Sequence, residues 1–174
     1  MATHAMTMDL GPKDAKFDLR FIDGMVLHHQ GAIAMAEAVL QNSQRDEMQQ
    51  LARAIIAAQQ GEIDQMQQWR QTWYPNAGLE PVMYDPQMRH TMTMTPEVQA
   101  AMGMDASLGE ADAQFDQRFI DAMVPHHEGA LVMAEQVLQN SDRPELQAAA
   151  QAILAAQKTE IDQMQQWRRE WYGQ

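Results

Sequence analysis

The chain has 174 residues, enough for one sizeable hydrophobic core or two small ones. Its 12 lysines and arginines stand against 24 aspartates and glutamates, and this net charge of −12 repels phosphate backbones and argues against nucleic-acid binding. Apolar runs fall short of the roughly 20 residues that a membrane span needs, so we expect no span. The 16 methionines and the absence of cysteine suit ligand chemistry based on thioethers and imidazoles in an oxidising compartment.

A tandem repeat organises the chain. Residues 14–76 align without a gap to residues 112–174, and about two thirds of the paired positions are identical. Methionine and histidine are frequent in the N-terminal segment, 1–13, and in the linker between the repeats, 77–111. We expect each repeat to form a helical hairpin, and the two hairpins to pack as one bundle.

The N-terminal segment alternates histidine and methionine with other residues, and the linker repeats this spacing. The segment has neither the basic start nor the apolar core of a signal peptide, so we expect that a targeting segment has been removed and that the protein is periplasmic or secreted. The candidate ligands in the two segments are His4, Met6, Met8, His90, Met92, Met94, Met102 and Met104.

These two segments lie outside the predicted amphipathic helices, so core packing does not readily explain their methionines. Closely spaced thioethers, together with imidazole, can wrap a soft monovalent ion such as Cu(I) or Ag(I). Mg²⁺ and Ca²⁺ prefer oxygen ligands and would be held poorly. An apolar docking strip is the alternative, but three occurrences of the spacing favour metal binding.

Each repeat is predicted to form two long helices. In the first helix of repeat 1, apolar residues from Phe21 to Val39 recur at spacings of three and four, and the second helix shows a stripe from Leu51 to Trp73. Ser43 is the expected N-cap of that second helix. Four such helices make an all-α fold, a four-helix bundle built from two duplicated hairpins.

The stretch from Pro75 to Ala111 holds four of the seven prolines and no long periodic segment. Thr95-Pro96-Glu97 predicts the start of one short helix, and we find no signal for strands.

A methionine and two histidines share one turn of the first helix in each repeat. Met25 precedes His28 and His29 by three and four positions, so a thioether and an imidazole can face one ion. A glycine follows each pair in mid-helix, and such irregularities tend to mark functional sites. Histidines that serve only core packing are the alternative. The second repeat has the same motif at Met123, His126 and His127.

The second helix places Glu62 in an apolar stripe, four residues before Met66, and Glu160 and Met164 repeat this pair. A buried carboxylate needs a partner. We expect Glu62 to accept a hydrogen bond from a histidine of the facing helix and to orient its ring, and a salt bridge with an arginine is equally compatible. Met66 and Met164 are candidate ligands, although methionine at such spacing often only fills the core.

Both repeats carry one ordered pattern, which in the first reads Phe21-Ile22-Asp23-x-Met25-x-x-His28-His29-x-Gly31-Ala32-x-x-Met35-Ala36, then Glu62-Ile63-x-x-Met66-x-x-Trp69. It resembles a bacterial domain-of-unknown-function family, number 305, that includes copper-resistance proteins. The resemblance implies a ferritin-like four-helix bundle, export to the periplasm and Cu(I) binding for copper tolerance. The ligands it implies are Met25, His28, His29 and Met35, with Met123, His126, His127 and Met133. Neither histidine pair has the preceding glutamate of di-iron bundles.

We therefore interpret the chain as a Cu(I)- and Ag(I)-binding protein that sequesters or delivers copper in the periplasm, with Cu(II) a further candidate ion at the histidines. A copper-transfer protein is an expected partner. The alternative is a helical interaction module without metal, in which the histidine pairs are structural or sense pH and the methionine-rich segments dock on a partner. We do not expect an enzyme, because the sequence shows no nucleophile–base arrangement and no cofactor loop.

Overall fold

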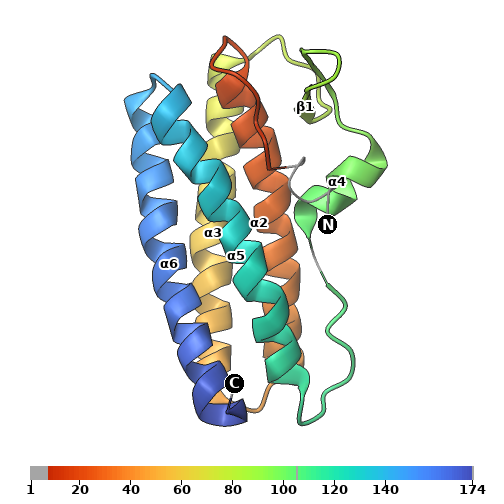
Figure 1. Ribbon diagram of the computed structural model, residues 1–174, viewed down its shortest axis with the longest axis vertical. Helices are drawn as coiled ribbons and strands as arrows, with labels where there is room; N and C mark the ends of the chain where they lie inside the picture. Colours follow the sequence, from red (N-terminus) through yellow and green to blue (C-terminus); the bar gives the residue numbers. More distant parts are fainter. Residues whose placement is uncertain (1–7, 105, 174) are drawn as a thin grey trace.

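Four long helices dominate the computed structural model, which describes residues 8–104 and 106–173 (Figure 1). Helices α2 (Phe17–Asn42) and α3 (Asp46–Trp73) form the first hairpin, and α5 (Phe115–Asn140) and α6 (Pro144–Tyr172) form the second. Helix α2 also contacts α5, which joins the two hairpins. The prediction of a mostly helical four-helix bundle is confirmed. Over the described ranges, no helix has the length and apolar character of a membrane span.

The first helix of each hairpin buries the stripe that its sequence predicts. In α2, the residues at three- and four-residue spacing from Phe21 to Val39 are buried. Helix α3 departs from its predicted pattern. The predicted stripe from Leu51 to Trp73 includes Ala58, which is exposed, and the residues that are buried are shifted around the helix. The buried residues of α3 are Met48, Ala52, Ile55, Gln59, Ile63 and Met66.

The predicted N-cap at Ser43 is wrong. Ser43 instead ends α2, where its backbone N–H donates to the carbonyl of Val39, and its Oγ accepts from the backbone N–H of Arg45. Helix α3 begins at Asp46 without a side-chain cap, and Asp46 and Glu47 in its first turn interact favourably with the helix dipole. The serine therefore shapes the turn between the helices.

Each hairpin tip packs on the open end of the other hairpin. The guanidinium of Arg45, in the tip of the first hairpin, lies 4.1 Å from the ring centroid of Trp171, and its Nε lies 3.2 Å from Asp116. Arg143 lies at the same distance, 4.1 Å, from the ring of Trp73. Cation–π contacts of this kind contribute about 0.5–1 kcal/mol each at partly exposed sites. The two repeats are thus arranged tip to base, and α2 and α5 cross near their middles.

The linker forms defined structure on one side of the bundle (Figure 1). Strands β1 (Val82–Asp85) and β2 (His90–Thr93) pair antiparallel, and α4 (Pro96–Gly103) follows, with Thr95 Oγ1 accepting from the backbone N–H of Val98. The short helix is confirmed, and the expectation of no strands is wrong. Each strand has only four residues and neither alternates between buried and exposed positions, so the period of a strand cannot be recognised in the sequence.

The end of α4 lies directly against α2. A methyl group built on Gly31, in α2, would lie 1.7 Å from the carbonyl oxygen of Gly103. Only glycine allows two backbones to approach this closely. Gly31 therefore fixes where the linker docks on the bundle.

We expect Gly31→Ala to destabilise the protein and the control Gly61→Ala to stabilise it. Both glycines lie in helix interiors, where alanine is favoured by ~1 kcal/mol, but nothing lies within 4 Å of a methyl group at Gly61. At Gly31 the clash with the Gly103 carbonyl outweighs that gain, since overpacking costs about 1–3 kcal/mol. Urea denaturation of both variants measures the difference. Equal stabilisation by both substitutions would show that α4 does not rest on Gly31.

Candidate metal centre

Four histidines meet where α2 crosses α5. His28 and His29 from α2 and His126 and His127 from α5 are each at most 1% exposed. The rings of His28 and His126 lie 3.7 Å apart between centroids, with 31° between their planes. The crossing thus joins the two histidine motifs, which are far apart in the sequence, into one buried cluster.

Glutamates of the second helices orient the outer two histidines. Nε2 of His29 lies 2.6 Å from Oε2 of Glu62, and His127 pairs with Glu160 in the same way. This is the contact expected for Glu62. Because a carboxylate oxygen accepts the hydrogen bond, Nε2 of each ring is the donor and carries a proton. Both Nδ1 atoms are buried and meet no hydrogen-bond partner within the described ranges.

The inner two histidines differ from each other. Nε2 of His126 lies 2.9 Å from the carbonyl oxygen of Gly103 and donates to it, whereas neither ring nitrogen of His28 has a hydrogen-bond partner among the residues described. Burial lowers the pKa of His126 to about 3. Burial, and then the charges of the other histidines, lower the pKa of His28 well below its usual 6.5. Both rings are therefore neutral at pH 7, with lone pairs available to a metal ion.

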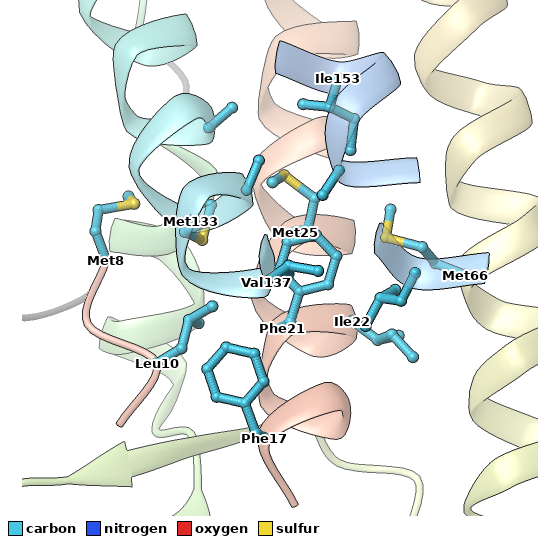
Figure 2. Close-up of a cluster of buried hydrophobic side chains, with 14 of the residues drawn as sticks. Met8, Leu10, Phe17, Phe21, Ile22, Met25, Met66, Met133, Val137 and Ile153 are labelled. Atoms are coloured by element: carbon cyan, nitrogen blue, oxygen red, sulfur yellow. The ribbon is translucent and has the colours of Figure 1, made fainter. Parts of the chain in front are cut away.

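Methionines lie in two buried hydrophobic groups of the bundle. The first group combines Met25 and Met66 of repeat 1 with Met133 of repeat 2, whereas the second combines two methionines of each repeat. Figure 2 shows Met8, Met25, Met66 and Met133 within the first group. The first group contains Met8, Met25, Met66, Met94, Met102 and Met133, and the second contains Met35, Met48, Met123 and Met164.

Three methionines of the N-terminal segment and linker belong to the core. Met8, Met94 and Met102 are 6%, 3% and 1% exposed. The expectation that core packing does not explain them is therefore wrong. Residues 8–13 and the described part of the linker contact the bundle, and Met8, Met94 and Met102 extend the first group of thioethers. Truncating them would affect folding as well as any ligand role.

The remaining candidates are more peripheral. Met92 and Met104 are half-buried, and Met104 packs against the first group. His90 is exposed, with Nδ1 3.3 Å from the carbonyl oxygen of Met88. His4 and Met6 lie outside the described residues. The structure thus brings most predicted ligands to the bundle centre and leaves His90 away from it.

The sequence analysis did not identify two participants in this centre, Gly103 and Met48. Gly103 contributes a carbonyl to His126, and Met48 lies in the second methionine group. Gly129, one of the two mid-helix glycines that the sequence analysis noted, lies against His28. Met48 could have been found from the sequence, because it continues the three- and four-residue spacing of the buried residues of α3. The glycine contacts depend on how the elements dock. Over residues 8–104 and 106–173, no three histidine, aspartate or glutamate side chains form a group able to hold a metal ion.

The domain of unknown function DUF305 matches residues 18–168. Among solved structures, CopM in its Cu(II)-bound form is 39% identical, with a TM-score of 0.71, and its Cu(I)-bound form is 36% identical, with a TM-score of 0.69. Each covers 89% of this chain and 97% of that one, and an Ag-bound form of CopM also matches. A DUF305 fragment from Deinococcus radiodurans is 28% identical with a TM-score of 0.67, covering 88% of this chain and 95% of that one. None of the curated protein sequences matches the chain.

The burial of His28 and His126 predicts how the stability of the metal-free protein depends on pH. The folded-state pKa of both is lowered from 6.5, that of His126 to about 3. Their contribution to the free energy of unfolding is therefore complete above pH 6.5 and is lost as pH falls toward 3, because the unfolded chain then binds more protons. The slope approaches ~1.4 kcal/mol per pH unit for each histidine.

Urea denaturation between pH 7 and 4 tests this expectation. His28→Gln should reduce the slope, and His90→Ala, at the exposed histidine, should leave it unchanged. Parallel slopes for the wild type and His28→Gln would contradict the neutral, buried state of His28.

Proposed function

We propose, from the premise that the chain belongs to the DUF305 family, that it binds Cu(I) and Ag(I) through methionine and histidine side chains and serves copper tolerance. The observation that carries the proposal is the set of buried imidazole nitrogens without hydrogen-bond partners among the described residues. One of them, Nε2 of His28, lies with Sδ of Met8 within 3.5 Å of the same point over Gly129. A buried polar atom normally has a partner, since leaving one unpaired costs about 1–3 kcal/mol. A soft metal ion supplies the missing partner.

The donor types favour a monovalent soft ion. Thioether and imidazole ligands suit Cu(I), whereas Mg²⁺ and Ca²⁺ need several oxygens. Among the residues that the structure describes, the carboxylates bonded to these rings are Glu62 and Glu160, which orient histidines and can offset the charge of a bound ion. The net charge of −12 attracts cations toward the surface. Cu(II) is a further candidate at the imidazoles.

We infer a role in sequestering or delivering copper in the periplasm or outside the cell. The absence of cysteine among 174 residues supports an oxidising compartment, in which thioethers replace thiolates. Delivery would require a copper-transfer partner protein. We also infer that the protein is not an enzyme. The alternative of methionine-rich docking strips is less favourable, because Met8, Met94 and Met102 are buried and cannot dock on a partner without unfolding locally.

We expect the purified protein to retain more than one equivalent of Ag(I), and of Cu(I) under anaerobic conditions, after dialysis. The two repeats supply two sets of histidine and methionine donors, and an excess of Mg²⁺ or Ca²⁺ should not displace the metal. Metal analysis after dialysis measures retention, and His90→Ala controls for binding at an exposed histidine. Retention no higher than that of a methionine-poor helical bundle would reject the proposal.

A further inference from the structure

The two repeats surround their inner histidines differently. On one side, Gly31 makes room for the carbonyl of Gly103, which accepts from Nε2 of His126 at 2.9 Å. The glycine at the equivalent place in repeat 2 is Gly129, and no carbonyl is among its nearest atoms. A methyl group built on Gly129 would lie 3.3 Å from Nε2 of His28 and 3.5 Å from Sδ of Met8.

We propose that Nε2 of His28 and Sδ of Met8 together hold one Cu(I) or Ag(I) ion over Gly129, in a site that only one repeat possesses. The inference rests on the proposed function and assigns one ligand pair within it. It joins a residue of the N-terminal segment to a residue of α2 against the surface of α5.

His28 and His126 differ in which ring nitrogen is free to bind a metal ion. Because Nε2 of His126 donates to Gly103, it carries the proton and cannot bind an ion. Neither nitrogen of His28 is engaged in a hydrogen bond within the described ranges. Its proton can therefore reside on Nδ1, which leaves the Nε2 lone pair directed to the side on which Met8 lies.

The contacts of a methyl group at Gly129 set an upper limit on the distance between the two donor atoms. Both donor atoms lie within 3.5 Å of one point, so they are at most about 7 Å apart. Bonds of a closed-shell ion such as Zn²⁺ to imidazole nitrogen and to sulfur are about 2.0 and 2.3 Å long, which requires a separation of about 4.3 Å or less. Methionine has three rotatable bonds and adapts easily. Cu(I) and Ag(I) share the closed shell and accept few, soft ligands.

Gln136 of α5 holds the backbone around Met8 in place. Its Nε2 donates to the carbonyl of Met8 at 2.6 Å, and its Oε1 accepts from the backbone N–H of Leu10 at 2.9 Å. Met8 is itself buried. The thioether is therefore positioned beside His28 before any ion binds. Gly129 lies in mid-helix, where alanine is favoured, and room for the ion explains the glycine.

Gly129→Ala tests the site, because the methyl group would take the space of the ion. The substitution touches only the ends of two side chains, so the metal-free variant should unfold no more easily than the wild type. Native mass spectrometry with Ag(I) should show one equivalent fewer than in the wild type. Met8→Leu should lose the same equivalent, and Met88→Leu, at an exposed methionine, should lose none.

Combining Gly129→Ala with Met8→Leu decides whether the two residues serve one site. If they do, the double variant loses one equivalent and no more. A full complement of Ag(I) in either single variant, or loss of two equivalents in the double variant, would overturn this site while leaving the proposed function intact. A wild-type protein that retains no Ag(I) would overturn both.

Discussion

Two imidazoles lie against each other where α2 crosses α5, and their burial requires both rings to stay uncharged. Much of the surrounding structure follows from this requirement. Gly31 allows α4 to bring a carbonyl to His126, and the glutamates of α3 and α6 hold the outer histidines by hydrogen bonds. His28 alone has no such partner at either nitrogen, considering the residues described. A neutral ring with an unused lone pair, buried in a core rich in thioethers, can bind a soft metal ion without first losing a proton.

The two duplicated hairpins pack on each other in a symmetric way. The segments outside the helices break this symmetry, because they cover the two histidine motifs differently. The contacts of Arg45 with Trp171 and of Arg143 with Trp73 are equivalent, so the tip of each hairpin rests on the base of the other. The linker and the residues around Met8 instead cover the first methionine group. One copy of the motif therefore meets a backbone carbonyl where the other meets a thioether, so two repeats that share about two thirds of their residues differ in chemistry.

The sequence predicts those features that depend on local periodicity. The stripe of α2 follows from spacing on a helix, and the short helix follows from its start at Thr95-Pro96. The need of Glu62 for a partner leaves a facing histidine and an arginine equally compatible, and in the structure the partner is His29. The burial of Met94 and Met102 does not follow, because it depends on how the linker docks on α2. The contact between His28 and His126 likewise depends on the crossing of two helices that are distant in the chain. Spacing within one helix carries no information on such contacts.

The ring nitrogens of the histidines offer the most direct test of the account. In ¹⁵N-labelled, metal-free protein, NMR at pH 7 should show His28 and His126 as neutral rings, with the proton of His126 on Nε2. Addition of Ag(I) should shift the resonance of a non-protonated nitrogen of His28 without protonating the ring. Ring resonances that do not change with Ag(I), in a protein that still binds the ion, would show that the buried histidines are structural and that copper binding rests on methionine alone.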